Sequence, residues 1–216
     1  DDVGQVFLGQ RLACANCHHH PYEKWSQDDY WGLASFFGRV ARKNLPVVGG
    51  NDNGRGVQVI FTRTSGGVVN KRTNKTADIK PLDGQPMEPT VEGDLREKLV
   101  DWMVDPKNPF FAKAVANRYW AHFFSRGIVD PLDDMRITNP PSNPELLDAL
   151  AANLVDSKFS LKTLVKTICK SRTYQLASAP NAFNKHDKQA YARYYPKRMG
   201  AEVLLDAVCQ VTDSPT

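Results

Sequence analysis

Three residues within five positions constrain this chain more than any other part of its sequence: Cys14, Cys17 and His18. They form the pattern C-x-x-C-H, in which two residues separate the thiols and an imidazole follows the second thiol. This spacing is typical of covalent attachment of a c-type haem, where the thiols bind the two vinyl groups of one porphyrin and the histidine ligates the iron. The sequence therefore predicts one covalent haem, held by Cys14 and Cys17, with His18 as its axial ligand.

The same residues admit two other interpretations. A C-x-x-C pair can supply half of a zinc site, and His20 is the best additional metal ligand because Pro21 stiffens its backbone. A non-haem zinc or iron domain at this loop is therefore the first rival interpretation. The second is a structural interaction module in which Cys14 and Cys17 form a disulfide bond. Bound metal without a chromophore would indicate the first rival, and neither metal nor chromophore would indicate the second.

The overall composition excludes several classes of protein. A net charge of +4 is too small to indicate a nucleic-acid partner. No apolar run reaches the roughly 18 residues that a membrane-spanning helix needs. The chain begins at Asp1 without a methionine, which predicts a fragment of a longer product. Because bacteria attach c-type haem outside the cytoplasm, we expect an exported protein of the periplasm or the extracellular space.

The hydrophobic pattern predicts a mainly α fold, an irregular helical arrangement with a small β-hairpin insertion around residues 57–72. The two strands of the hairpin are expected at 57–63 and 68–72, on either side of a glycine pair. Capping residues placed before apolar periodic segments predict where the helices start. Helices are expected at 3–13, from Ser26 through about Ala41, from Asp94, at 108–125 with Gly127 as the terminating glycine, from Asn143, from Ser160 and at 199–211.

A haem iron held by His18 has a second axial position, for which two side chains are candidates. His122 is expected on one stripe of the helix predicted at 108–125, and it is also a candidate ligand for a metal outside haem. Met87 lies in a proline-flanked loop that can present its thioether. Arg118 and Arg136 are candidates for neutralising the haem propionates. A structural ion pair with a nearby aspartate is the simpler expectation for both arginines.

Basic residues gather near the C-terminal end. Lys162, Lys166 and Lys170 form a stripe along one side of the helix predicted from Ser160. Residues 185–198 add further lysines and arginines with tyrosines between them. A solvated helix face is the simplest interpretation of the lysine stripe, and docking of an acidic redox partner is the sharper one.

Longer runs of sequence resemble a known family. Residues 14–31, from Cys14 to Trp31, resemble the planctomycete cytochrome c-like domain found in large exported bacterial proteins, and they carry its C-x-x-C-H-x-H-P motif. Residues 117–129, 139–148 and 171–175 resemble the uncharacterised domain that usually follows it. The resemblance covers most of the chain and implies two domains: a haem-attachment segment at 1–93 with the β insertion, and a helical domain at 94–216.

The resemblance also implies a function. It supports Cys14 and Cys17 as haem-attachment sites and His18 as the iron ligand. We therefore expect an extracytoplasmic electron-transfer module with one haem, an electron carrier rather than an enzyme. Such a module needs a redox partner protein, which the basic stripe suggests is acidic, or a homo-oligomer that brings haems close together.

Overall fold

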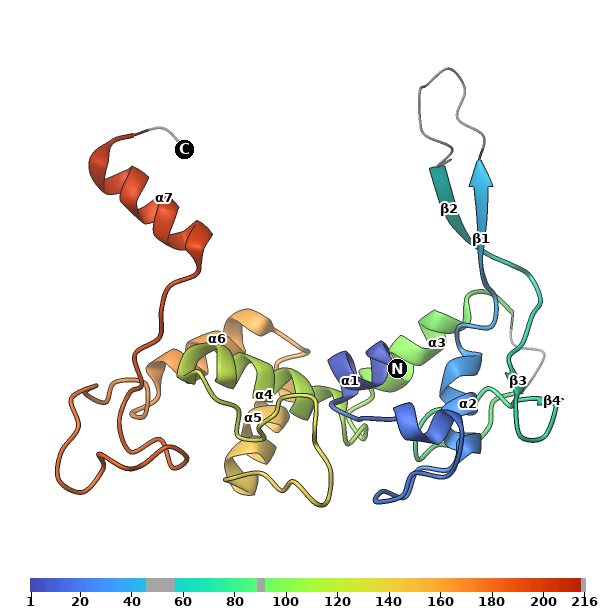
Figure 1. Ribbon diagram of the computed structural model, residues 1–216, viewed down its shortest axis with the longest axis horizontal. Coiled ribbons are helices and arrows are strands. Elements are labelled where there is room, and N and C mark those ends of the chain that lie inside the picture. Colours follow the sequence, from blue (N-terminus) through green and yellow to red (C-terminus); the bar gives the residue numbers. More distant parts are fainter. Residues whose placement is uncertain (46–56, 89–91, 215–216) are drawn as a thin grey trace.

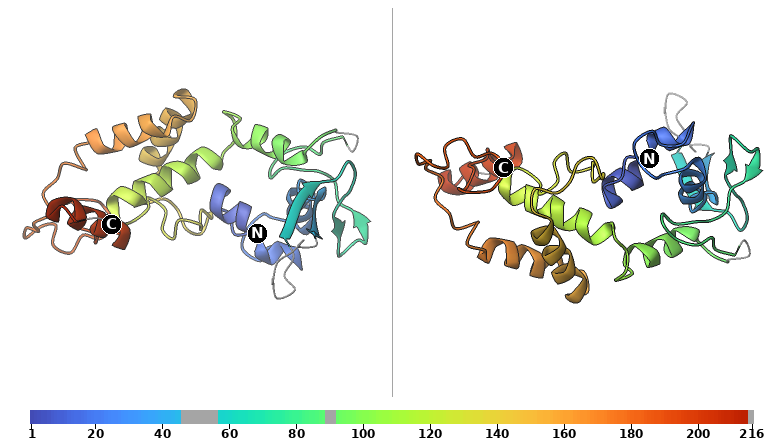
Figure 2. Two further views of the ribbon diagram at one scale, coloured as in Figure 1. Left: turned by 90° about the horizontal axis from the view of Figure 1, so that it is seen from above. Right: turned by 90° about the horizontal axis from the view of Figure 1, so that it is seen from below.

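The computed structural model describes residues 1–45, 57–88 and 92–214. Within these ranges the chain forms helices and two small sheets, so the predicted mainly α fold with a β insertion is confirmed (Figure 1). Figures 1 and 2 show an elongated molecule in which one long helix, α4, leads from a body of earlier elements to a body of later ones. The elements are α1 (Asp2–Leu8), η1 (Ala13–Asn16, a 3₁₀ turn), α2 (Gln27–Ser35), β1 (Val40–Leu45), β2 (Val57–Thr62), β3 (Val69–Asn70), β4 (Lys75–Thr76), α3 (Leu95–Met103), α4 (Phe111–Phe124), α5 (Pro144–Asp156), α6 (Leu161–Lys170) and α7 (Ala201–Thr212).

The first hydrophobic core joins α1, η1, α2 and α3. Ala15, which lies between the two cysteines of the motif, is fully buried in it, and so are Leu8 and Phe36. Full burial of a leucine or phenylalanine contributes about 1.5–3 kcal/mol, so this cluster anchors the motif turn. Helix α3 contributes its inner face to the same core: Leu95, Leu99 and Met103. By its packing, α3 is therefore part of the N-terminal body. The domain boundary near residue 94 stays a prediction.

The β insertion differs from the predicted hairpin in its pairing. Strand β2 does not pair with the segment at 68–72; it pairs antiparallel with β1, with Ala41 opposite Phe61. Residues 69–70 pair instead with 75–76 in a second sheet. Helix α2 ends at Ser35 rather than near Ala41, because Val40 and Ala41 form backbone hydrogen bonds across β1 and β2 instead of continuing the helix. Figure 1 shows β1 and β2 projecting from the body.

The second hydrophobic core joins α4, α5 and α6. Trp120 and Phe124 of α4 stack with ring centroids 4.2 Å apart, and Tyr191 meets Trp120 edge-on at 5.3 Å. The Tyr191 hydroxyl donates to the Gly127 oxygen at 2.7 Å. The segment after α6 is therefore held against α4 by a buried tyrosine, although it has no regular secondary structure there.

The end of α4 also differs from the prediction. The helix ends at Phe124, and Ser125 rather than Gly127 adopts the left-handed conformation, with φ 64°. Gly127 is required for a steric reason instead. A Cβ at this position would lie 2.2 Å from the Val129 oxygen and 2.6 Å from a Leu132 methyl. The glycine therefore marks a close backbone approach, not a helix cap.

The two bodies meet where the N-terminal segment contacts α4 and the loop before α5. Gln10 Nε2 donates to the Met135 oxygen at 3.0 Å, and Met135 N donates to the Gly9 oxygen at 2.9 Å. Arg11 pairs with Asp133 at 2.8 Å and with the buried Asp134 at 3.4 Å. Backbone and charged contacts therefore fix residues 9–11, just before the cysteine motif, against residues 133–135.

Helix α7 stands away from both cores (Figure 1). The helix predicted at 199–211 forms at Ala201–Thr212, but its apolar residues Val203, Leu204 and Val208 are each about half exposed. Across residues 1–45, 57–88 and 92–214, none of the helices combines the length and apolar character needed to cross a membrane.

Candidate functional site

The cysteine motif forms a tight turn at the surface of the N-terminal body. Both Cys17 N and His18 N donate to the Cys14 oxygen at 3.3 Å, which folds the five residues back on themselves. Ala15 points into the first core, whereas the side chains of Cys14 and Cys17 are exposed free thiols. The turn therefore presents two thiols and an imidazole to the outside while its centre is anchored inside.

The ring of His18 is held in a defined tautomer. Its Nδ1 lies 2.7 Å from the backbone oxygen of His19. A carbonyl oxygen only accepts hydrogen bonds, so Nδ1 carries the proton and a neutral ring leaves Nε2 with a free lone pair. This is the arrangement that orients histidine for metal ligation through Nε2.

The two following histidines bind backbone groups. Nδ1 of the buried His20 accepts from Tyr22 N at 3.2 Å and from Glu23 N at 3.0 Å. A neutral His20 therefore carries its proton on Nε2 and has no lone pair to offer a metal ion. His19 Nδ1 accepts from Gln27 N at 3.3 Å, one of the unpaired donors at the start of α2. Both rings stabilise the loop that follows the cysteines.

A network of charges borders the motif. Arg136 makes a two-point ion pair with the buried Asp134, with its Nη2 2.9 Å from Oδ2. This is the structural ion pair that was the simpler expectation for Arg136. The hydrogen bond to Asp134 is the main cause that raises the pKa of Arg136. The guanidinium of Arg136 is therefore held by Asp134.

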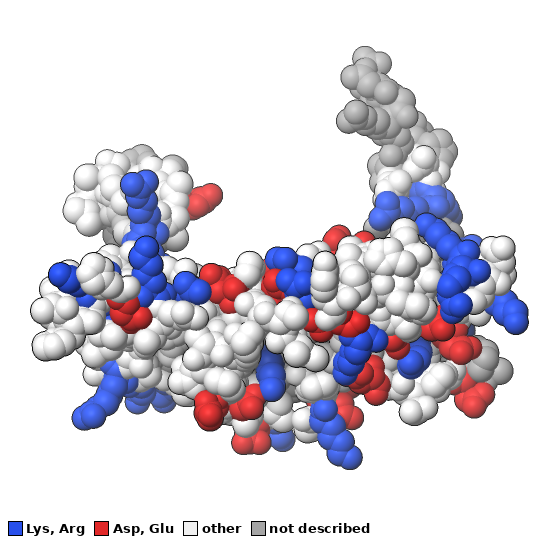
Figure 3. Space-filling view, turned by 60° about the horizontal axis from the view of Figure 1, so that its bottom comes forward, with Lys and Arg blue, Asp and Glu red and all other residues white. Residues whose placement is uncertain are grey.

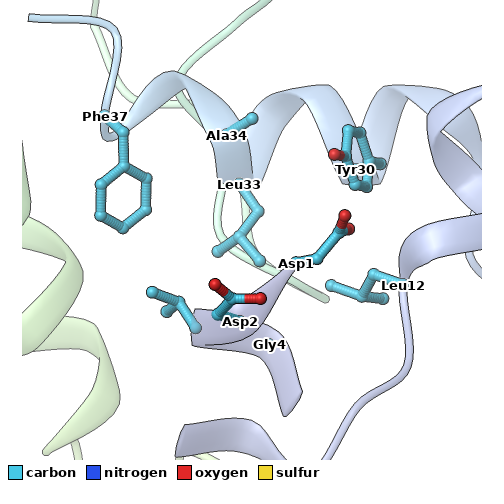
Figure 4. A pocket seen from close by; sticks show the side chains of 9 residues that line it. Asp1, Asp2, Gly4, Leu12, Tyr30, Leu33, Ala34 and Phe37 are labelled. Carbon is cyan, nitrogen blue, oxygen red and sulfur yellow. The ribbon is translucent and has the colours of Figure 1, made fainter. Parts of the chain in front are cut away.

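An open hollow lies between the start of α1 and the face of α2 that carries Tyr30, Leu33 and Ala34 (Figure 4). Its volume is about 260 Å³. Leu12 lines one wall and Tyr30 another, and the Tyr30 hydroxyl accepts from Asn16 Nδ2 at 2.8 Å. This hydrogen bond links the residue between the two cysteines directly to the wall of the hollow. The sequence contains no signal that pairs Asn16 with Tyr30, and this contact was not predicted.

Two predicted site residues lie on α4, away from the motif turn. Arg118 donates to the oxygens of Val6 at 3.0 Å and Gln5 at 3.3 Å, which are terminal acceptors of α1. Arg118 therefore fastens α1 to α4. His122 is exposed one turn further on, edge-on to Phe123 at 5.1 Å. Turn η1 packs on α2, whereas α4 packs on α1, α5 and α6, so the fold does not bring His122 to the cysteines.

Met87 lies in the same body as the motif. Its backbone bridges to Ile79, with Met87 N donating to the Ile79 oxygen at 2.8 Å. Its partly buried side chain packs against the hydrophobic cluster that includes Ala15. Of the two candidates for a second axial ligand, Met87 is thus the one that shares a core with the motif turn.

The donor side chains around the turn do not form a closed metal site. Within the three described ranges, no three His, Cys, Asp or Glu side chains converge in the way that a bound metal ion requires. A metal site using Cys14, Cys17, His18 and His20 would need the His20 ring to release its two backbone partners.

Comparison with protein families yields two matches in tandem. Residues 95–216, which are 122 of the 216 residues, match PSD1, described as a protein of unknown function (DUF1553). Residues 1–42 match PSCyt2, also described as a protein of unknown function (DUF1549). No curated protein and no solved structure matches the chain. The PSCyt2 match covers the cysteine motif, and the PSD1 match begins at the first residue of α3.

Proposed function

The chain belongs to the PSD1 family of proteins of unknown function (DUF1553), and we propose that it is part of an exported c-type cytochrome with one haem on Cys14 and Cys17. The observation that carries the proposal is one turn holding three groups: two exposed thiols and an imidazole whose Nδ1 faces the His19 oxygen, which leaves Nε2 available to a metal. Each thiol would add across one vinyl group of the porphyrin, its hydrogen passing to the vinyl carbon. This addition has no leaving group and needs no oxidant.

The residues present suit a haem in this position. His18 would ligate the iron through Nε2, and the hydrogen bond to the His19 oxygen would fix the ring. Arg136 would place a positive charge near a propionate. When bound, a haem supplies a one-electron redox centre. Because Cys14, Cys17 and His18 are all exposed, this part of the chain would cover a porphyrin only partly.

An electron carrier is the activity that these residues support best. A haem left partly uncovered can pass electrons to a docked protein, so a redox partner or a second copy of the chain would complete the path. Export follows from the attachment chemistry, since bacteria make these thioether bonds outside the cytoplasm. Met87 is the better candidate for the second axial ligand, because it shares the core of the motif turn.

The test is production in a bacterial host that exports the chain and expresses a c-type haem attachment system. The readout is the pyridine haemochrome spectrum of the denatured protein, together with haem staining of its band on a denaturing gel. We expect wild type and the matched control Cys169→Ser to retain haem, because Cys169 lies on α6 outside the motif. The double variant Cys14→Ser/Cys17→Ser should retain none. A well-characterised c-type cytochrome expressed in parallel reports whether the attachment system works.

Two outcomes would contradict the proposal. If the attachment system works and wild type is colourless but holds stoichiometric zinc or iron, the non-haem metal interpretation is correct. If wild type is colourless, free of metal and lacks two titratable thiols at the motif, the disulfide-bonded interaction module is correct.

A further inference from the structure

Positive charge is concentrated in one stretch of the chain. Residues 157–200 contain ten lysines and arginines and a single acidic residue, Asp187, whereas the rest of the chain has 18 basic and 23 acidic residues. The net charge of +4 is therefore the sum of +9 on residues 157–200 and −5 on the rest of the chain. Figure 3 shows lysines and arginines at this end of the molecule and also at the opposite end, where more acidic side chains lie among them.

The lysines of α6 lie along one exposed line. Lys162, Lys166 and Lys170 are exposed, while the opposite side of the helix buries Leu164 and Ile168. Residues four apart in a helix are about 6 Å apart along its axis, so the three ammonium groups form a row with a regular repeat. Further exposed bases follow in the segment after α6: Arg172, Lys185, Lys188 and Arg198.

These cations have no acidic partner nearby. Among the ion pairs of the described residues, none involves a lysine or arginine of 157–200. The carboxylate of Asp187 accepts from the backbone N–H of Gln189, Ala190 and Ala192. These hydrogen bonds hold the pKa of Asp187 well below its ordinary value, and its charge serves the loop rather than a lysine.

We propose that the α6 lysine row and the exposed bases after it, here called the basic surface, bind a linear acidic polysaccharide. A row of ammonium groups at a regular spacing fits a flexible chain that carries sulfate or carboxylate groups along its length. Binding gains free energy from release of the counterions of that chain, so it needs neither a pocket nor close shape complementarity. Compact, mobile ammonium groups also tolerate anions at variable positions.

The aromatic residues of this region argue against single-stranded nucleic acid. Such partners need exposed rings on which bases can stack. Tyr191 is buried, Tyr174 meets Tyr194 edge-on at 5.6 Å, and the Arg193 guanidinium covers Tyr195 at 4.5 Å. Two large apolar side chains of 177–200 are exposed, Phe183 at 98% and Met199 at 55%, and of these only Phe183 is aromatic.

The proposal is independent of the haem. The basic surface belongs to α6 and the segment that follows it, whereas the cysteine turn packs on α2 in the other body (Figure 1). Failure of haem attachment would leave the basic surface unchanged, and loss of the lysine row would leave the thiols unchanged. The two proposals can therefore fail separately.

The experiment measures binding of the whole chain to dextran sulfate and to hyaluronate between 20 and 300 mM salt. The test variant is Lys162→Gln/Lys166→Gln/Lys170→Gln. The matched control is Lys43→Gln/Lys75→Gln/Lys107→Gln, which removes the same charge from three exposed lysines outside 157–200. Circular dichroism checks that each variant is folded. An oligothymidylate and polyglutamate, at equal charge concentration, represent nucleic acid and acidic protein.

We expect wild type to bind at least one of the two polysaccharides more tightly than either comparison polyanion. The test variant should lose at least tenfold in affinity. It should also make log affinity fall less steeply with log salt, because three ammonium groups no longer displace counterions from the polyanion. The control should change affinity less than twofold.

Equal losses in both variants would mean that the effect comes from net charge alone, and this would overturn the proposal. Tighter binding of oligothymidylate or polyglutamate would also overturn it, in favour of the corresponding partner.

Discussion

The amide of Asn117 pairs with the backbone of Val129 in both directions. Its Nδ2 donates to the Val129 oxygen at 2.8 Å, and its Oδ1 accepts from Val129 N at 2.9 Å. Asn117 is fully buried on α4, so this pair ties the helix to the loop that leads to α5. The side chain of Asn117 thus satisfies both backbone hydrogen-bonding groups of Val129, which lies outside any strand.

Replacing Asn117 by leucine should destabilise the fold strongly. The leucine would leave both backbone groups of Val129 buried without partners, at about 1–3 kcal/mol each. We expect the free energy of unfolding to fall by about 3 kcal/mol, measured by urea denaturation followed by circular dichroism. Asn153→Ala is the matched control, because its side chain makes only one long contact, at 3.4 Å to Thr167 Oγ1. A loss below 1 kcal/mol in Asn117→Leu would contradict this role.

His18 and His19 should differ in their effect on the haem iron. His18→Gly should keep covalent haem at the wild-type level but change the visible spectrum, because the thioethers remain and the axial ligand is lost. Added imidazole should restore the spectrum by occupying the vacated position. His19→Ala should leave the spectrum unchanged, since the His18 ring bonds to the backbone oxygen of residue 19 and not to its side chain. Equal spectral changes in both variants would argue against His18 as the specific ligand.

His20 should behave as a structural residue. In His20→Ala, Tyr22 N and Glu23 N lose their shared acceptor, so we expect a loss of about 2 kcal/mol in the free energy of unfolding. His20→Asn should recover part of this loss, because its Oδ1 can accept the same donors. Haem content should stay at the wild-type level in both folded variants. A stable His20→Ala protein that had lost bound zinc or iron would instead support the non-haem metal interpretation.

The start of several helices could be predicted because capping is local. Ser26 accepts from Asp29 N, Asn143 from Leu146 N and Ser160 from Thr163 N, and each contact lies within three residues. The pairing of β2 could not be predicted in this way. Its partner β1 is separated from it by residues 46–56, and the apolar spacing of Val40 and Ala41 continues that of the preceding helix.

The candidate site shows the same limit. The spacing of Cys14, Cys17 and His18 is written in the sequence, and the fold presents all three on one turn. The separate roles of the three consecutive histidines could not be predicted from the sequence, because they depend on which backbone group each ring contacts in the fold. Helical periodicity put His122 on the correct helix, but it could not show that α4 leads away from the cysteines.

The cap of α3 should make that helix sensitive to acid. The Asp94 carboxylate binds the Arg96 side chain, with Nε 3.0 Å from Oδ1, and it accepts from Arg96 N at 3.0 Å. These hydrogen bonds hold the pKa of Asp94 well below its ordinary value in the folded protein. Because the folded pKa is depressed, the stabilisation is fully present above the unfolded pKa of about 3.9 and is lost as pH falls through the folded value.

Asp94→Asn should therefore lower the stability of α3 at pH 6 and flatten the decline of that stability below pH 4. Hydrogen exchange of α3 amides across this range provides the measurement. Asp101→Asn removes the same charge from an exposed position of α3 without touching the cap, so an equal flattening in that control would refute the assignment to Asp94.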